Sequence, residues 1–498
     1  MDIHTTALLV IALGFGFYMA WNIGANDVSN AMGTSVGSGA LTLKAAVIIA
    51  AIMEFSGAFF VGSHVTETMR SGIVDLTAFR EHENGASMLA YGMLASLLAA
   101  GVWLNLASYF GWPVSTTHSL VGAIAGFGLV SMGSDAINWI GPSGIWGTFK
   151  GEASMVGIVL SWVISPALAA IISYALFRLV LNTIFYRPDP LAAAKKITPI
   201  MSFCVLITMT MMLHFKGMKP FWKEHFGLAP TDARALAIGL SVSLLIAAVG
   251  TFFSWYLARR LKTDEVQHQQ LKDLYAARSL SKAIMHLRRV RDTADEPARA
   301  QAVATLQSAQ TLLHEVNTRT KKVSEHNVFR DVERIFIYLQ IVSASFVAFA
   351  HGANDVSNAI GPLSIIIDTV RHNAIPETSA VPTWVLGLGA VGIVVGLATW
   401  GWRVIQTVGK RITELTPSRG FCAEFAAALT ILIASVNKLP VSTTHTLVGA
   451  VLGVGLARGI GALNLNMVRD IAASWVVTIP AGAGLSILFY YTLLAIFG

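Results

Sequence analysis

The stretch "GANDVSNA" occurs twice in this chain, at residues 24–31 and at residues 352–359, and each copy lies within an apolar segment. A second stretch, "PVSTTH", also occurs twice, at residues 113–118 and 440–445. The copies are 328 residues apart for the first motif and 327 for the second, so both motifs keep one register. The chain is therefore predicted to contain two related halves.

The composition places these halves in a membrane. Of 498 residues, 54% are hydrophobic and only 13% are charged, which is more apolar than an ordinary soluble domain. Segments long enough to cross about 30 Å of hydrocarbon lie at 6–36, 43–66, 86–109, 153–181, 197–214, 236–258, 334–361, 383–406 and 471–497. We therefore expect an all-α polytopic membrane protein in contact with membrane lipids.

The chain divides into four predicted regions. A first transmembrane repeat at 1–181 is followed by linking transmembrane helices at 182–258, a polar insert at 259–333 and a second repeat at 334–498. In the insert, leucines such as Leu271, Leu274 and Leu287 recur at helical spacing, which predicts an amphipathic pair of helices. The insert is basic, but no aromatic or glycine-rich recognition motif accompanies its charge, so we expect no nucleic-acid partner.

Positive charge near short loops predicts the orientation of the chain, because Lys and Arg accumulate on the cytoplasmic side. This rule places the insert in the cytoplasm and both termini outside, provided that segments 422–437 and 441–457 form a hairpin that enters and leaves by the same face. The second half is then inverted relative to the first, as in many secondary transporters. We also expect the first long segment to unwind near Gly24 and Gly33.

The repeated acidic motif contains side chains that bind small, hard cations through oxygen. An ionised aspartate at the centre of a membrane helix costs about 2.5–3.5 kcal/mol, so a pair of them indicates a function. The alternative is a polar pair that only holds helices together. The candidate cation ligands are Asn26, Asp27 and Asn30 in the first copy and Asn354, Asp355 and Asn358 in the second.

The repeated hydroxyl motif is typical of a helix N-terminus, where proline is tolerated and Ser or Thr caps the first turn. Free N–H groups and about half a positive charge make such an end an anion site. The alternative is a pair of ordinary caps at loop ends. The candidate anion-binding residues are Ser115, Thr116, Thr117, Ser442, Thr443 and Thr444.

Glu54 and Glu424 are further carboxylates within apolar runs, and such acids are functional candidates, although either one could instead be protonated and pair two helices. Cation and anion motifs belong together physically, because a phosphate in a low-dielectric cavity loses several kcal/mol of solvation unless cations accompany it. Such mutual dependence is the basis of symport.

At these residues the sequence resembles the PiT family of inorganic phosphate transporters, whose duplicated signature is similar to both motifs, over about residues 6–181 and 334–497. The resemblance implies an inverted-repeat fold with about twelve transmembrane segments including two helical hairpins, a homodimer, and coupling to sodium or to protons with metal phosphate. It assigns sodium to Asn26, Asp27, Asn354 and Asp355, assigns phosphate to both STT runs, and makes Glu54 and Glu424 important for transport. The longer string around the first copy is similar to the sodium-coupled branch.

The sequence thus predicts a cell-membrane (inner-membrane) importer of inorganic phosphate by sodium symport, with sodium as co-substrate and no other cofactor. A proton-coupled or metal-phosphate symporter and a sulfate transporter remain alternatives on the same fold. We do not expect an enzyme, since no HExxH, GxSxG or Walker-type stretch occurs in a suitable context. A channel is not expected either, because no continuous polar stripe is present.

Overall fold

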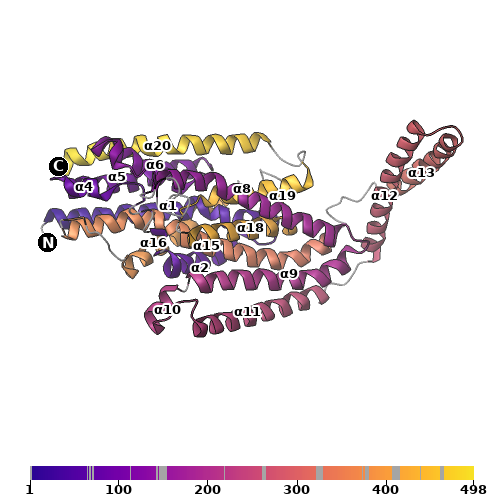
Figure 1. The fold of residues 1–498 in the computed structure, drawn as a ribbon, viewed down its shortest axis with the longest axis horizontal. Helices are drawn as coiled ribbons and strands as arrows, with labels where there is room; N and C mark the ends of the chain where they lie inside the picture. Colours follow the sequence, from indigo (N-terminus) through magenta and orange to yellow (C-terminus); the bar gives the residue numbers. More distant parts are fainter. Residues whose placement is uncertain are drawn as a thin grey trace. The chain divides into compact units, whose positions relative to one another are not determined.

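The structure is a computed structural model, and it describes residues 3–63, 65–66, 69, 72–112, 114–141, 144, 154–217, 219–260, 265–320, 329–372, 374–375, 381–405, 415–437, 439–459 and 465–497. Within these residues the fold consists of helices (Figure 1). Ten of the described helices are long and apolar enough to cross a membrane, which confirms the prediction of a polytopic membrane protein.

The long helices of the first half are α1 (Ile3–Gly37), α2 (Leu43–Val61), α5 (Gly85–Tyr109), α6 (Thr116–Met132) and α8 (Met155–Val180), with the short α4 (Leu76–Glu81) before α5. The linking region contains α9 (Pro190–Met212), α10 (Lys219–Phe226) and α11 (Ala233–Arg260), and the insert contains α12 (Glu265–Thr293) and α13 (Ala298–Thr320). The second half contains α15 (Arg330–His372), α16 (Thr383–Gly396), α18 (Pro417–Val436), α19 (Thr443–Arg458) and α20 (Leu465–Phe497).

Helices of the two halves pack against each other through glycines. A Cβ added to Gly122 of α6 would lie 2.5 Å from the carbonyl oxygen of Ile479 in α20, and one added to Gly449 of α19 would lie 2.3 Å from that of Pro166 in α8. Gly122 and Gly449 are 327 residues apart, the same offset as the hydroxyl motifs. The hydroxyl-bearing helices of both halves thus pack in the same way on a long helix of the opposite half.

The expected unwinding of the first segment is wrong, because α1 is one α-helix from Ile3 to Gly37. Gly24 serves close packing instead: a Cβ there would lie 1.9 Å from the carbonyl oxygen of Ile393 in α16. Glycine at this position lets two membrane helices touch backbone to backbone, as small residues do in membrane interfaces.

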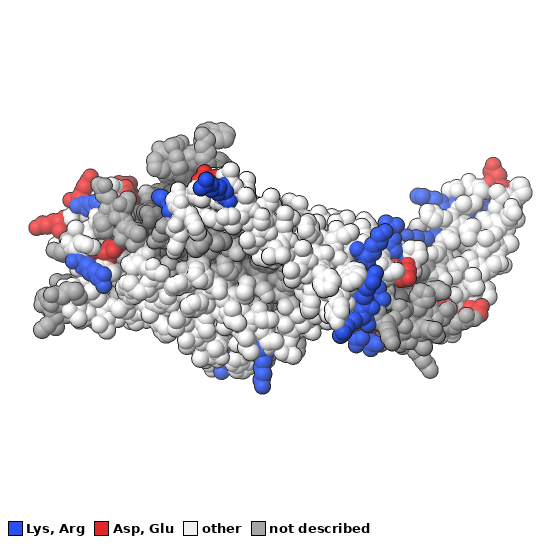
Figure 2. Space-filling view, turned by 90° about the horizontal axis from the view of Figure 1, so that it is seen from below, with Lys and Arg blue, Asp and Glu red and all other residues white. Residues whose placement is uncertain are grey.

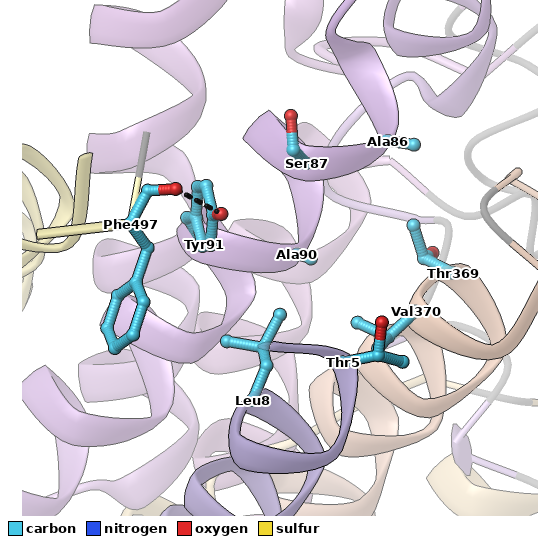
Figure 3. Close-up of a pocket in the computed structure, with 9 residues that line it drawn as sticks. All are labelled: Thr5, Leu8, Ala86, Ser87, Ala90, Tyr91, Thr369, Val370 and Phe497. Carbon is cyan, nitrogen blue, oxygen red and sulfur yellow. Dashed lines mark hydrogen bonds between the residues drawn. The ribbon is translucent and has the colours of Figure 1, made fainter. Parts of the chain in front are cut away.

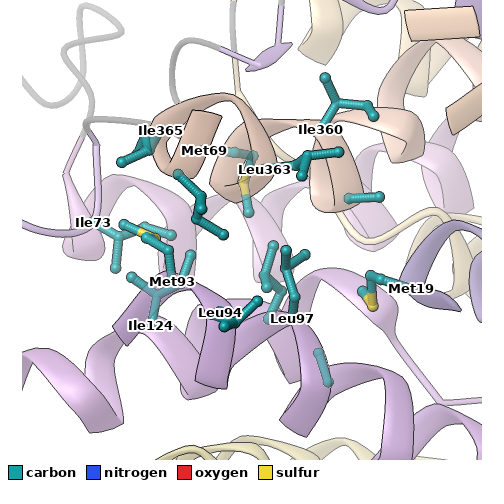
Figure 4. Packing of buried hydrophobic residues seen from close by; sticks show 14 of the residues in the cluster. Met19, Met69, Ile73, Met93, Leu94, Leu97, Ile124, Ile360, Leu363 and Ile365 are labelled. Atoms are coloured by element: carbon teal, nitrogen blue, oxygen red, sulfur yellow. The ribbon is translucent and has the colours of Figure 1, made fainter. Parts of the chain in front are cut away.

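The main apolar core fills the space between α1, α5, α6 and α15 (Figure 4). Leu97 of α5 and Leu363 of α15 are fully buried in this cluster, together with Met93 and Ile360. Such packing fixes the helices that carry the two acidic motifs, because buried side chains of this size lose contacts as soon as the helices separate.

The outer surface is apolar where helices face away from the core. On α11, Leu245 and Phe252 are 65% and 63% exposed, which suits a surface covered by lipid and would be unusual in water. At the end of α11, Arg259 and Arg260 lie over the rings of Trp255 and Tyr256, an aromatic and basic pairing typical of a membrane interface. Figure 2 shows Lys and Arg gathered in a band, beside stretches of surface with few charged side chains.

Contacts divide the chain into two compact units. One comprises Met1–Arg178, Cys204–Ala248 and Ile337–Gly498, and the other comprises Leu179–Phe203 and Val249–Phe336. The second unit contains α12 and α13, which form the helix pair predicted for the insert. All the candidate site residues lie in the first unit.

Candidate functional site

Both hydroxyl motifs begin helices, as predicted. Ser115 is the N-cap of α6 and its Oγ accepts a hydrogen bond of 3.2 Å from the backbone N–H of His118. Ser442 caps α19 in the same way, accepting 3.2 Å from the N–H of His445. Each motif therefore presents the positive end of a helix dipole in the interior of the bundle.

The two helix ends meet each other. Thr117 Oγ1 donates a hydrogen bond of 3.4 Å to the carbonyl oxygen of Val441, and Thr444 Oγ1 donates one of 3.4 Å to that of Val114. The ring centroids of His118 and His445 are 4.2 Å apart. The six hydroxyls predicted to bind an anion are thus brought together from opposite halves, and all are buried.

The histidines that end the two motifs pack rather than join the acidic cluster. The His118 ring centroid lies 3.7 Å from that of Trp162, and the His445 ring centroid lies 3.5 Å from that of Trp475. Trp162 belongs to α8 and Trp475 belongs to α20, and each directly follows a serine. These contacts support a structural role for the two histidines.

The last asparagine of each acidic motif reaches across to the hydroxyls of the other half. Asn30 Nδ2 of the first half donates to Thr444 Oγ1 of the second at 2.7 Å. In return, Asn358 Nδ2 of the second half donates to Thr116 Oγ1 and Thr117 Oγ1 of the first, at 3.2 and 3.3 Å. The two motifs of the two halves therefore form one site.

The two aspartates lie in the same buried site. Asp355 Oδ2 accepts a hydrogen bond of 2.9 Å from Thr443 Oγ1. Asp27 Oδ1 accepts longer ones from Asn30 Nδ2 at 3.4 Å and from Thr444 Oγ1 at 3.5 Å. Both carboxylates are fully buried. Through these hydrogen bonds, the hydroxyls predicted to bind an anion are direct neighbours of the carboxylates predicted to bind a cation.

The first asparagine of each acidic motif holds a neighbouring helix. Asn26 Nδ2 donates to Ser108 Oγ at 2.9 Å and to the carbonyl oxygen of Trp112 at 3.2 Å. Asn354 Nδ2 donates to Ser435 Oγ at 2.9 Å. Since Ser108 and Ser435 sit near the ends of α5 and α18, the asparagines anchor the segments that lead into the hydroxyl motifs.

Sequence reasoning missed His351, which directly precedes the second acidic motif. Its Nε2 lies 2.9 Å from Asp355 Oδ2 and 4.0 Å from Asp27 Oδ2, and its Nδ1 lies 3.1 Å from Glu54 Oε1. This histidine therefore links Glu54 of α2 to both aspartates. The available signal in the sequence was that a polar residue, His351, directly precedes the second copy of the motif, whereas Ile23 precedes the first.

Glu424 lies in a separate cluster. Its Oε1 accepts hydrogen bonds from Thr34, Ser35 and Gln340 at 2.5, 2.6 and 3.1 Å, and its Oε2 accepts one of 2.7 Å from Ser343. Thr34 follows Asp27 by seven residues of α1, which is roughly 10 Å along the helix. The structure thus places the two predicted glutamates differently: Glu54 joins the aspartates through His351, and Glu424 ties α1 to α15 and α18.

One surface pocket lies away from this site (Figure 3). Its lining comes from α1, α5, α15 and α20 and has no charged side chain: Thr5, Leu8, Ala86, Ser87, Ala90, Tyr91, Thr369, Val370 and Phe497. Thr5 precedes Asp27 by 22 residues of one helix, roughly 33 Å. A pocket whose lining has no cationic side chain is a poor phosphate site.

The chain is similar to known transporters. The profile of the phosphate transporter family matches residues 23–486. The protein named inorganic phosphate transporter 2-1, chloroplastic, from Arabidopsis thaliana is 41% identical over 492 residues, covering 98% of this chain and 73% of that protein. A solved structure described as the sodium-dependent phosphate transporter superposes with a TM-score of 0.71 at 33% identity, covering 98% of this chain and all of that one.

The family match spans both halves and therefore includes both copies of each motif. The buried hydroxyls, amides and aspartates that meet between the halves thus lie within the matched range. This chain belongs to the phosphate transporter family.

Proposed function

We propose that this transporter imports inorganic phosphate by sodium symport, through alternating access of the site formed by the acidic and hydroxyl motifs. The observation that carries the proposal is a pair of contacts between the halves, Asn30 with Thr444 and Asn358 with Thr117. They join residues predicted to bind a cation to residues predicted to bind an anion, in one buried site. The similarity to a sodium-dependent phosphate transporter supports sodium as the coupling ion.

Phosphate would be bound by the hydroxyls of residues 115–117 and 442–444 and by the two helix N-termini. In the structure these hydroxyls already donate to Asp355, Asp27 and backbone carbonyls. A phosphate oxygen is a stronger acceptor than a carbonyl, since hydrogen bonds to charged groups contribute about 1.5–3 kcal/mol. The same donors can therefore turn to the anion without being left unpaired.

Sodium would be bound through the oxygens of Asp27 and Asp355, with the motif asparagines as further ligands. The site holds three buried carboxylates, those of Asp27, Asp355 and Glu54, against a single imidazole. Adding a phosphate raises the negative charge, and burying unpaired charge costs several kcal/mol per ion. Sodium ions offset this cost, so anion and cations favour each other's binding.

Alternating access would follow from an inverted arrangement of the halves. Each half supplies one hydroxyl helix that packs on a long helix of the other, α6 on α20 and α19 on α8. Rocking one half against the other would then expose the site to each side in turn. We assign both termini to the outside and the insert to the cytoplasm of a cell inner membrane, and we propose a homodimer.

Sulfate is the closest competing substrate, because a helix N-terminus does not by itself distinguish two tetrahedral oxyanions. Hydrogen phosphate keeps an O–H group, which can donate a hydrogen bond to an ionised Asp27 or Asp355. Sulfate has no such proton and would meet repulsion from both aspartates. The acidic motifs therefore favour phosphate.

The test is uptake of radiolabelled phosphate into proteoliposomes under a sodium gradient or a proton gradient imposed separately. We expect an inward sodium gradient to drive accumulation that excess sulfate does not reduce. Accumulation driven by the proton gradient alone, with no response to sodium, would assign the protein to the proton-coupled alternative.

A further inference from the structure

The glycine contacts align the two halves residue by residue. Gly24 and Gly352 open the two acidic motifs. A Cβ on Gly24 would lie 1.9 Å from the carbonyl oxygen of Ile393, and one on Gly352 would lie 2.2 Å from that of Glu54. Ile393 of α16 and Glu54 of α2 therefore occupy corresponding places.

A second pair of glycines gives the same alignment. A Cβ on Gly396 would lie 1.8 Å from the carbonyl oxygen of Trp21, and one on Gly57 would lie 2.0 Å from that of Phe349. Gly396 and Gly57 each follow the aligned α16 or α2 residue by three positions, and Trp21 and Phe349 each precede a motif glycine by three. The correspondence therefore holds along the whole contact.

Against this alignment, one polar pair stands out. The residues before the motif glycines are Ile23 and His351, and their helix neighbours are Ile393 and Glu54. The first acidic motif thus has two isoleucines, one from each half, where the second acidic motif has a histidine and a glutamate in contact at 3.1 Å. Since two isoleucines suffice to pack this helix crossing, packing alone does not account for the buried polar pair.

The histidine has the surroundings of a metal ligand. Asp27, His351 and Asp355 each offer one ligand atom, and these atoms all lie within 4.8 Å of one another. Nε2 lies 2.9 Å from Asp355 Oδ2 and 4.0 Å from Asp27 Oδ2. Two ligands of a tetrahedral ion, each at about 2.1 Å, are about 3.4 Å apart, so small shifts of these side chains bring all three onto one ion.

Two independent features support the same conclusion. Asp27 Oδ2 and Asp355 Oδ1 are buried and accept no hydrogen bond from the residues that the structure describes. In addition, a histidine that binds a metal usually gives its other ring nitrogen to a carboxylate, which fixes the ring. Glu54 stands in this position, on Nδ1 of His351, while Nε2 faces the aspartates.

We propose that Asp27, His351 and Asp355 bind a divalent first-row transition cation such as Zn²⁺ or Co²⁺, with Glu54 holding the histidine in place. Imidazole nitrogen suits these ions, whereas hard cations such as sodium prefer oxygen. Both aspartates also belong to the proposed sodium site, so the divalent ion competes with sodium and inhibits phosphate uptake. This effect on transport rests on the proposed function.

The test uses the purified full-length protein in detergent, without sodium or phosphate, titrated with Co²⁺. We expect the visible absorption of four-coordinate Co²⁺, which Zn²⁺ abolishes by displacement. The double variant Glu54→Ile/His351→Ile copies the isoleucine pair beside the first acidic motif and should lose this absorption. Glu54→Gln should retain the spectrum with an affinity about 10- to 100-fold lower.

Ile393→Leu is the matched control, since it changes the aligned position in the other half and should leave Co²⁺ binding unaltered. If the double variant does not fold, as judged by gel filtration, His351→Gln takes its place and should likewise lose the absorption. Absence of four-coordinate Co²⁺ in the wild type, or an unchanged spectrum in the folded histidine variants, would overturn the site.

Uptake assays separate this proposal from the function on which it partly rests. Sodium-driven phosphate uptake without any Co²⁺ binding would refute only the divalent site. Co²⁺ binding in a protein whose uptake does not respond to sodium would refute sodium symport and leave the metal site standing. Zn²⁺ that binds without slowing sodium-driven uptake would refute the competition.

Discussion

Replacing Thr444 with valine should weaken phosphate binding without disturbing the fold. The Thr444 hydroxyl accepts a hydrogen bond of 2.7 Å from Asn30 Nδ2, but its own proton makes only long contacts, 3.4 Å to the carbonyl of Val114 and 3.5 Å to Asp27 Oδ1. That proton is thus free to turn to a phosphate oxygen. Valine has nearly the same shape and leaves Asn30 its contact of 3.4 Å with Asp27.

The expected magnitude follows from the charge of the acceptor. A hydrogen bond to a charged group is worth about 1.5–3 kcal/mol, and about 1.4 kcal/mol corresponds to a factor of ten. Thr444→Val should therefore raise the phosphate concentration at half-saturation by about 10- to 100-fold. Thr117→Val, which removes the corresponding hydroxyl of the other half, should have an effect of similar size.

The assay is the initial rate of sodium-driven uptake of radiolabelled phosphate into proteoliposomes, measured over a range of phosphate concentrations. Thr430→Val is the matched control, because Thr430 is also buried but donates 2.8 Å to the carbonyl of Ala426 within its own helix. An unaltered half-saturation concentration in both Thr117→Val and Thr444→Val would refute phosphate binding by these hydroxyls and leave them as helix caps.

Three further outcomes are expected. Asp27→Asn and Asp355→Asn, motivated by the buried duplicated carboxylates, should each reduce sodium-dependent phosphate uptake to background, and retention of both rate and sodium dependence would reject their cation role. Glu424→Gln should lower the melting temperature in detergent, because an amide nitrogen would face groups that now donate hydrogen bonds to the carboxylate, and each buried donor left unpaired costs about 1–3 kcal/mol. The volume-conserving Leu97→Met serves as control. Equal melting temperatures of Glu424→Gln and the wild type would contradict the argument. Deleting 265–320, motivated by its position outside both repeats, should leave uptake measurable, whereas complete loss in a folded protein would make the insert part of the mechanism.

Much of the site could be predicted because its chemistry is repeated locally. Thr116 and Thr443 follow a capping serine in both copies, and Asp27 and Asp355 sit in identical eight-residue stretches. Local patterns of this kind predict helix starts and buried polar groups, and their duplication predicts that they meet. The structure adds that Asn30 and Asn358 bond to the hydroxyls of the opposite half.

The remaining features depend on contacts between distant helices. Glu54 lies 297 residues before His351, so no pattern in either segment predicts their pairing. Two of the hydroxyls on Glu424, those of Thr34 and Ser35, are also distant in sequence, 390 and 389 residues away. Gly24 was predicted to break a helix, and instead it brings two helices together, because a glycine permits either outcome and only the packing partner decides.

The central claim is that one phosphate is held by both halves at once, and the number of phosphates bound per chain tests it most directly. Equilibrium dialysis of the purified protein with radiolabelled phosphate in saturating sodium should give one phosphate per chain, and either Thr117→Val or Thr444→Val should weaken that single site. Two phosphates per chain, or one site that responds to only one of these substitutions, would contradict a shared site.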